Sequence, residues 1–383
     1  MNLLKNTIIV VLLLFLIVVC NKEQKETIVP VPHTINTAEK TLLEKSNQIG
    51  FDCFKKLLKN NYNGDNIIFS PINISLSFNL LIQASDEFTK REIKQYLHVN
   101  HLKDSSIIEG FDKLNKLFSE IDENIIVKGQ NQIAMHANIP INENISVFSN
   151  KRDYISIIQD ENAGFVENLK TSPIHGEQFF QMINSIDFSA QVKYQSRIEP
   201  SPFYATPDES KFINMAVATS IFNYYADISL QAVELPLGRG NYNILILVPR
   251  GSQTLNNLAE NLDGRLLKRI QEKYKPQALE VYLPLMELSS VETLREVLIS
   301  SRLNKCFNEK TANFTSLSKA EPLYLSDYEQ IINFSLKQNE SDNLYKNIKN
   351  TAKSTFLVDK PFLFIVYEKY SEGIIFIGKI AKL

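Results

Sequence analysis

Helical and strand patterns occupy different parts of this chain, and that separation limits its fold class more than any other feature of the sequence. Apolar side chains recur at helical spacing between residues 41 and 60, with lysines between them. Strand-length apolar runs come late, at residues 242–248, 362–367 and 374–380, and the last two flank residues 371–373, a turn sequence that predicts a hairpin. A regular βαβ alternation is missing, so we expect an α+β fold with a largely antiparallel sheet.

Other segments carry weaker patterns. Residues 73–84 are apolar enough for a buried helix, and residues 89–97 begin like a short amphipathic helix. One apolar helical face extends over residues 255–270, and residues 279–288 predict a strand that a proline interrupts. The stretch from 100 to 180 is polar and weakly patterned, so it predicts no particular element.

Composition is that of a folded globular protein. The chain has 383 residues, of which 44% are hydrophobic and 22% charged, and these values exclude wholesale disorder and a collagen-like fibre. A formal net charge of -2 gives no electrostatic reason to expect a nucleic-acid partner. No internal repeat and no linker follow residue 45, which predicts one large domain. Tryptophan is absent, although the chain has 15 Tyr and 23 Phe.

The N-terminus has the pattern of an export signal. Apart from its final thiol, the run from Ile8 to Cys20 has no polar side chain, and it is shorter than the roughly 20 residues that a membrane span needs. We therefore predict a signal peptide at residues 1–20, a polar tether at residues 21–45 and a secreted product. The alternatives are a lipoprotein anchored at Cys20 and an uncleaved signal, and only these would place the protein at a membrane.

A search for catalytic and metal-binding motifs finds none. The acyl-transfer elbow GxSxG, the zinc signature HExxH and the phosphate-binding loop GxxxxGK[ST] are all missing from the sequence. His98 and His101 are three positions apart, but no carboxylate or cysteine accompanies them at ligand spacing. Cys53 and Cys306 are expected to be buried free thiols, with pairing left open. The sequence therefore predicts no catalytic residue, no metal, no cofactor and no enzyme.

Several short motifs follow one another along the chain. They are NIIFSPINIS at 66–75, INSIDF at 183–188, VELPL at 233–237, LILVP at 245–249, ANFT at 312–315, LS at 325–326, VDKPFLFIV at 358–366 and GIIFIGK at 373–379. Together these motifs resemble the serpin family. Their order and spacing over residues 46–383 make the resemblance specific, and the chain is identified as a member on that basis.

This resemblance implies a single serpin domain over residues 46–383, with three β-sheets, eight or nine helices and an exposed reactive loop. It also implies a monomer whose partner is a serine or cysteine protease, with no catalytic residue of its own. Inhibitory members act as bait: the protease cuts the loop, becomes covalently attached, and is displaced as the cut loop enters the central sheet as an extra strand. The bait loop is expected near residues 338–358.

The hinge at the start of this loop departs from the family pattern. Inhibitory serpins have small residues there, because every second side chain must fit beneath the sheet. The hinge residues here are Gln338, Glu340, Ser341 and Asp342, and only Ser341 fits that pattern. The side chains that would face inward are polar or large, namely Asn343, Tyr345, Asn347 and Lys349. Since a buried polar group without a partner costs about 1–3 kcal/mol, this hinge argues against insertion.

The loop itself is shorter than the family pattern, so its two ends give different estimates of the bond that a protease would cut. The reactive-loop candidates are Lys349, Asn350, Lys353 and Ser354. The two lysines suit a trypsin-like protease, although a lysine in a polar loop is usually a solvated side chain. Between residues 154 and 184 there is also little room for the helix that crosses the central sheet in the family.

A buried polar cluster is expected where the central sheet would open. Ser70 and Asn184 match the family, Asn73 stands in place of a serine, and Gln330 stands in place of a histidine. The simplest interpretation is that these four side chains satisfy one another's hydrogen bonds. Val192 stands where the family usually has a tryptophan, at the top of the sheet.

Two functions follow from these features. The fold and its loop predict a secreted protease inhibitor that acts on a trypsin-like or papain-like protease. The hinge favours the alternative, a non-inhibitory serpin that serves as a carrier, chaperone or surface ligand.

Overall fold

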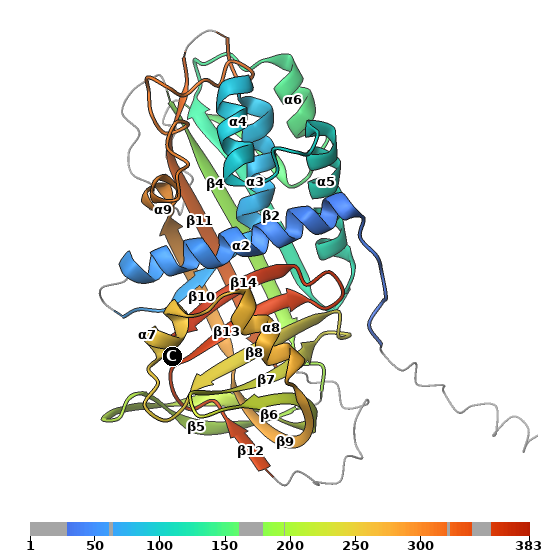
Figure 1. The fold of residues 1–383 in the computed structure, drawn as a ribbon, viewed down its shortest axis with the longest axis vertical. Coiled ribbons are helices and arrows are strands. Elements are labelled where there is room, and N and C mark those ends of the chain that lie inside the picture. The colour runs from blue at the N-terminus through green and yellow to red at the C-terminus, as the bar shows by residue number, and fades with distance from the viewer. Residues whose placement is uncertain (1–28, 61–63, 161–178, 195, 320–321, 339–353) are drawn as a thin grey trace, which may run out of the picture. The chain divides into compact units, whose positions relative to one another are not determined.

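The computed structural model describes residues 29–60, 64–160, 179–194, 196–319, 322–338 and 354–383 (Figure 1). Its contacts divide the chain into residues 1–30 and a compact unit of residues 31–383, and the description below concerns the second unit. Eight helices lie within the described residues. None of these helices is both long and apolar enough to span a bilayer. The helices are α2 (Thr37–Asn60), α3 (Pro71–Ala84), α4 (Glu87–Tyr96), α5 (Asp104–Glu120), α6 (Glu143–Asn150), α7 (Leu255–Glu260), α8 (Gly264–Glu272) and α9 (Arg295–Ser300).

Helix α2 begins earlier than the sequence pattern indicates. Asn36 and Glu39 form a reciprocal cap: the amide N–H of Glu39 donates to Oδ1 of Asn36, and the amide N–H of Asn36 donates to Oε2 of Glu39, both at 2.9 Å. The cap satisfies donors that the first turn leaves open, so the helix starts at Thr37. This start lies within the predicted polar tether of residues 21–45, whose last nine positions belong to the helix.

One sheet has five strands, in the order β10 (Met286–Thr293), β11 (Tyr324–Lys337), β4 (Phe179–Gln191), β2 (Ile126–His136) and β3 (Ile155–Asp160). Helices α3 and α5 pack on the β2 side of this sheet, where Figure 1 shows them in front of the strands. Nearly every side chain of α3 is buried, as its apolar sequence predicts. This five-stranded sheet is the central sheet of the molecule.

The second sheet has nine strands. They are β1 (Ile67–Phe69), β14 (Ile374–Ile380), β13 (Phe362–Glu368), β8 (Tyr242–Pro249), β7 (Leu230–Leu237), β6 (Glu209–Ala226), β9 (Lys275–Pro284) and β12 (Ser354–Leu357), with β5 (Ser196–Thr206) beside β6. Strand β6 pairs with β5 over residues 209–218, with β9 over residues 215–224 and with β7 over residues 223–226, so it joins two smaller sheets into one hydrogen-bonded network. The α+β prediction is confirmed, and the described strands form two such networks where the resemblance implies three sheets.

The predicted hairpin near the C-terminus is confirmed, because β13 and β14 pair antiparallel around residues 371–373. The helical face predicted over residues 255–270 is split, since α7 and α8 are separate helices. Asp263 starts the second helix: its Oδ1 accepts from the amide N–H of Leu266 at 2.8 Å and so caps the N-terminus of α8. Leu258 and Leu266 are both buried across this break, so the apolar period survives without one continuous helix.

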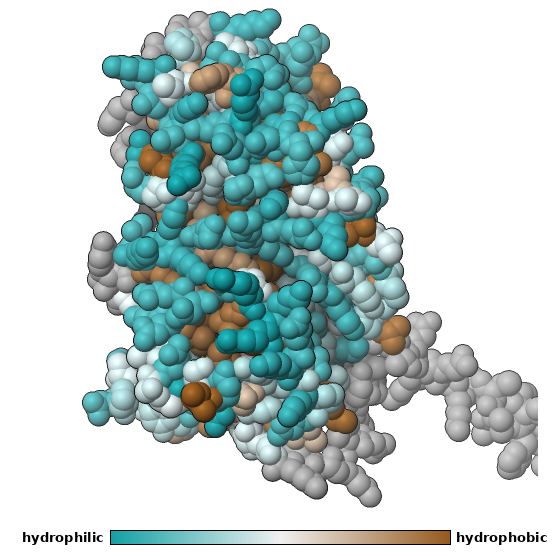
Figure 2. All heavy atoms as spheres, in the orientation of Figure 1, coloured by the Kyte–Doolittle hydropathy of each residue, from teal (hydrophilic) through white to brown (hydrophobic). Residues whose placement is uncertain are grey.

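Elements that the sequence analysis left unassigned lie between residues 100 and 160. Helix α5 buries Ile107, Phe111, Leu114 and Phe118, which are three or four positions apart on one face. The polar residues between them obscure this spacing in the sequence. Figure 2 shows the result for one face of the molecule, where hydrophilic side chains cover most of the helices and apolar ones appear only in places.

Candidate functional site

Strands β4 and β11 lie side by side at the centre of the five-stranded sheet, and we call their paired edges the β4–β11 seam. They pair in parallel from Tyr324 and Phe179 at one end to Lys337 and Gln191 at the other, with one irregularity between Leu325 and Asp327. No described strand lies between them. The seam is therefore closed at the place where the resemblance implies that a cut loop would enter.

Aromatic rings close the seam from the core side. The Phe188 ring of β4 stacks on the Phe334 ring of β11, with centroids 5.2 Å apart and planes 11° apart. Phe376 of β14 meets both rings edge-on, at 5.3 and 5.5 Å. Such pairs add about 0.5–1.5 kcal/mol each beyond burial. A strand that entered the seam would separate Phe188 from Phe334 and lose their stacking.

The predicted polar cluster lies beneath the same seam, and all four of its residues are fully buried. Gln330 connects three segments: its Oε1 accepts from the backbone N–H of Ser70 at 2.9 Å, and its Nε2 donates to Oδ1 of Asn184 at 2.7 Å and to the carbonyl of Ser70 at 3.1 Å. Asn184 belongs to β4 and Gln330 to β11, so their amide–amide bond crosses the seam. The structure thus brings the four predicted residues together.

The cluster differs in two details from the prediction that the four side chains satisfy one another's hydrogen bonds. Ser70 takes part through its backbone, and its hydroxyl has no hydrogen-bond partner among the described residues. Asn184 also donates to Oδ1 of Asn131 at 2.5 Å, so Asn131 of β2 is a fifth member that the sequence analysis missed. Asn131 carries no local signal, because only the register between β2 and β4 places it opposite Asn184.

Asn73 anchors the cluster to the first turn of α3. Its Nδ2 donates to the carbonyl of Ser185 at 2.7 Å, and its own carbonyl accepts from Nδ2 of Asn184 at 2.9 Å. Gly129 of β2 lies directly against this side chain, since a Cβ added there would be 2.5 Å from Oδ1 of Asn73. The glycine is therefore required by the close approach of β2 to α3.

The hinge and loop residues are only partly described. Gln338 follows the last residue of β11, and its Nε2 donates to the carbonyl of Ser196 at 2.7 Å. Ser354 is the exposed first residue of β12 and pairs with Leu279 of β9. The remaining hinge and reactive-loop candidates lie outside the described residues: Glu340, Ser341, Asp342, Lys349, Asn350 and Lys353. The prediction that residues 154–184 leave little room for a helix also concerns residues that lie largely outside the described ones.

Val192 follows the C-terminal end of β4. Its side chain is buried, and the residue bridges Leu237 of β7. On either side of it, the amide N–H of Gly238 donates to Gln191 and that of Lys193 donates to Pro236, at 2.9 and 2.8 Å. A small apolar side chain thus fills the position where the family usually has an indole.

The outward face of the seam holds a buried carboxylate that sequence reasoning missed. Glu329 of β11 is 4% exposed, and its Oε2 has no partner among the described residues. Burial, together with the nearby charge of Asp327, raises the pKa of Glu329 from its ordinary 4.5 to about 7. The same desolvation raises the pKa of Asp327 itself. This acid is a charge-sensitive point beside the seam, and no local sequence signal marks its burial.

The thiols and histidines carry no chemistry at this site. Cys53 and Cys306 are free and buried, as the sequence predicts, and burial raises the pKa of Cys53 to about 11. His98 and His101 are exposed. Within the described part of the chain, no three His, Cys, Asp or Glu side chains are grouped as metal ligands would be.

Comparisons with known proteins agree with this architecture. The family model described as "Serpin (serine protease inhibitor)" matches residues 44–153 and 149–383, so the chain belongs to the serpin family. Serpin H1 of Gallus gallus is 22% identical over 368 residues, which are 89% of this chain and 91% of that protein. The leukocyte elastase inhibitor of Xenopus laevis is 22% identical over 364 residues, 86% of this chain and 96% of its own length. Serpins are non-enzymatic inhibitors or carriers, so the prediction that the chain is not an enzyme holds.

Solved structures show the same fold. The crystal structure of mouse protein-Z dependent protease inhibitor matches with a TM-score of 0.79 at 19% identity, and the match covers 90% of this chain and 98% of that one. At this identity the likeness concerns the fold alone. Because the relatives are distant, the hinge and the loop of this chain cannot be inferred from theirs.

Proposed function

We propose that this serpin is secreted and presents residues 338–358 as bait to a trypsin-like serine protease or a papain-like cysteine protease. The closed β4–β11 seam is the observation that carries the proposal. In a serpin whose loop has not been cut, no extra strand has entered the sheet at this place, and the loop is still available as bait. Two of the similar proteins are named as inhibitors, one of leukocyte elastase and one a protease inhibitor dependent on protein Z. Lys349 and Lys353 supply the basic side chains that a trypsin-like pocket binds.

The contacts along the seam favour binding without trapping. Entry of a strand would break the Phe188–Phe334 stack and the hydrogen bond between Asn184 and Gln330. In exchange, the hinge would place polar and large side chains such as Asn343 and Tyr345 beneath the sheet. Because the entering segment replaces well-packed contacts with poorly matched ones, the net gain of insertion is small. This supports the second candidate function, a non-inhibitory carrier, chaperone or surface ligand.

Incubation with a panel of trypsin-, elastase- and papain-like proteases tests both candidates. We expect cleavage between residues 338 and 358, mapped by mass spectrometry, and no covalent complex on a denaturing gel. A band at the summed mass of protease and serpin would show trapping and overturn the non-inhibitory candidate. Absence of any cleavage or binding within this loop would overturn the bait proposal itself. Lys349→Gln and Lys353→Gln variants identify which lysine directs a trypsin-like enzyme.

Heat stability before and after cleavage tests the seam directly. If the cut loop stays out of the sheet, the melting temperature of the cleaved protein will stay within about 2 °C of the intact value, a shift of roughly 1–2 kcal/mol. A rise well beyond that would show that the loop inserts despite its polar residues.

Secretion has a separate test. Expression with the native N-terminus should release a product that begins at Asn21 into the medium or periplasm. A Cys20→Ser variant distinguishes the alternatives, since lipid attachment requires the thiol and cleavage before Asn21 does not. Retention of the wild type in the membrane fraction together with release of the variant would establish the anchor.

A further inference from the structure

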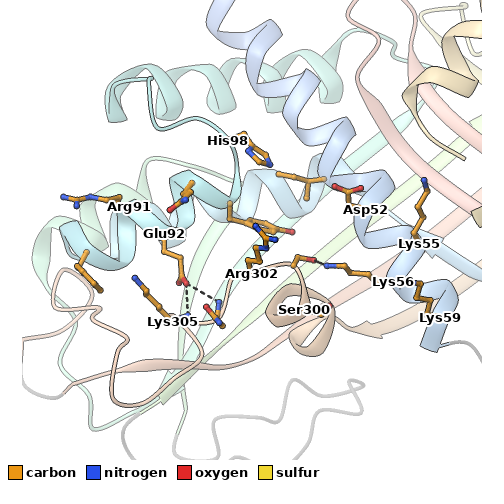
Figure 3. Close-up of a pocket in the computed structure, with 16 residues that line it drawn as sticks. Asp52, Lys55, Lys56, Lys59, Arg91, Glu92, His98, Ser300, Arg302 and Lys305 are labelled. Atoms are coloured by element: carbon orange, nitrogen blue, oxygen red, sulfur yellow. Dashed lines mark hydrogen bonds between the residues drawn. The ribbon is translucent and has the colours of Figure 1, made fainter. Parts of the chain in front are cut away.

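A concave site lies among the C-terminal part of α2, helix α4 and the residues that follow α9 (Figure 3). Its volume is about 840 Å³, within the range of roughly 300–1,000 Å³ that small-molecule sites occupy. Six cationic side chains line it, from segments that are far apart in the sequence. They are Lys55, Lys56, Lys59, Arg91, Arg302 and Lys305.

The two carboxylates of the pocket offset only part of the charge of these six cations. Glu92 is buried, and its oxygens accept from the backbone N–H groups of Lys305, Cys306 and Asn304 at 2.9, 3.2 and 3.3 Å. Asp52, the other carboxylate, acts electrostatically on Lys56. Among the described residues, none of the six cations forms an ion pair with a carboxylate. The pocket therefore holds more positive than negative charge.

Two of its side chains occupy backbone positions that favour glycine. His98 follows α4 with φ of 55°, and Arg302 follows α9 with φ of 73°. Left-handed residues at helix C-termini are usually glycine, and a side chain there adds strain. The described residues include three non-glycine residues with positive φ, and two of the three line this pocket. Both side chains lie near the centre of the close-up in Figure 3.

A purely structural explanation covers only part of the cluster. Cations near a helix C-terminus interact favourably with the helix dipole, which accounts for Lys59 in the last turn of α2. Arg91 lies in the middle of α4, and Lys305 lies in a loop, where no dipole explains it. The Lys305 ammonium lies 4.3 Å from the centre of the Phe88 ring, and Lys56 donates to the Ser301 hydroxyl at 2.6 Å. These contacts hold cations in place without neutralising them.

We propose that this pocket binds a small organic molecule that carries two or more phosphate groups, with Arg302 and Lys305 as its main contacts. In Figure 3 the labelled cations are spread over α2, α4 and the residues after α9, so a ligand with separated charges fits better than a single phosphate, while the Arg91 side chain points away from the other labelled cations. Guanidinium groups bind phosphate oxygens in a bidentate way, which suits Arg302. Ile49 and Tyr96 add apolar surface to the lining. The inference is independent of the protease loop.

Calorimetric titration of the full-length protein with inorganic tripolyphosphate and with inositol hexakisphosphate tests the proposal. We expect saturable one-to-one binding of the wild type. The double variant Arg302→Gly, Lys305→Gln should weaken binding by about tenfold or more, a loss of about 1.4 kcal/mol. The matched control is Lys273→Gln, Lys275→Gln, which removes two exposed cations, one of them at the C-terminus of α8, and should change the Kd less than about twofold.

Thermal unfolding of the single variant Arg302→Gly separates ligand binding from folding. Glycine suits a φ of 73°, so the variant should melt no lower than the wild type while binding tripolyphosphate more weakly. A lower melting temperature would mean that the arginine serves the fold. Equal weakening by the double variant and its control, or no saturable binding at millimolar tripolyphosphate, would overturn the proposal. So would binding that occurs only with a sulfated polysaccharide or anionic lipid vesicles.

Discussion

The two faces of β11 differ sharply in how their polar groups are satisfied. Gln330 faces the core and makes three hydrogen bonds, two to Ser70 and one to Asn184. Its neighbour Glu329 faces the other way, is also buried, and leaves Oε2 without a partner among the described residues. The inner face of the seam is held by the hydrogen-bonded amides of Gln330 and Asn184 and by stacked rings, and the outer face carries an acid whose charge the fold disfavours. Contacts on the core side therefore stabilise the seam, and ionisation of Glu329 on the outer side destabilises it.

The largest expected effect comes from the stacked rings of the inner face. Phe334→Ala removes a ring that contacts Phe188, Phe364 and Phe376 and leaves a cavity beneath the seam. We expect the free energy of unfolding to fall by about 3–5 kcal/mol, measured by urea denaturation. Phe212→Ala is the matched control, since Phe212 is 72% exposed and its loss should cost under about 0.5 kcal/mol. Similar losses for both variants would contradict the importance of the inner face.

A smaller loss is expected for the polar cluster. Gln330→Ala leaves the buried amide of Asn184 and the backbone N–H of Ser70 without their hydrogen-bond partner. The free energy of unfolding should therefore fall by about 2–4 kcal/mol. Asn333→Ala is the control on the opposite face of β11, where the exposed amide contacts Asp187 and Ser289. We expect that change to cost under about 1 kcal/mol by the same measurement. If Asn333→Ala costs as much, the contrast between the faces fails.

The smallest effect is a change in pH dependence. The pKa of Glu329 rises from 4.5 to about 7 in the folded state, so its contribution to stability is full below pH 4.5 and is lost as the pH rises through 7. Glu329→Gln removes this loss and should make the protein more stable than the wild type at pH 8 by about 1–3 kcal/mol, with little difference at pH 4.5. Denaturation at both pH values checks this. The exposed Glu287→Gln serves as control, and identical pH profiles for all three proteins would show that Glu329 ionises freely.

Sequence patterns predicted the elements whose apolar residues repeat without interruption, such as α2, α3 and the β13–β14 hairpin. Helix α5 was missed because polar residues separate its buried positions, and the break between α7 and α8 was missed because Asp263 caps a helix inside a continuing apolar period. The polar cluster was predicted through family resemblance. Asn131 and Glu329 could not be predicted, since strand register and burial decide their environments and neither has a local signature.

The pairing of β1 with β14 has a consequence for how the chain reaches its native state. Ile67, Ile68 and Phe69 pair with residues 377–379, and Asn66 bonds the carbonyl of Lys382, 316 positions later. Ribosomes add about 5–20 residues per second, so β1 waits tens of seconds for its partner. Helix α3 also contacts β14 and shares that delay. Completion of the fold thus waits until β14 has been synthesised, and the apolar segments that precede it need protection from aggregation until then.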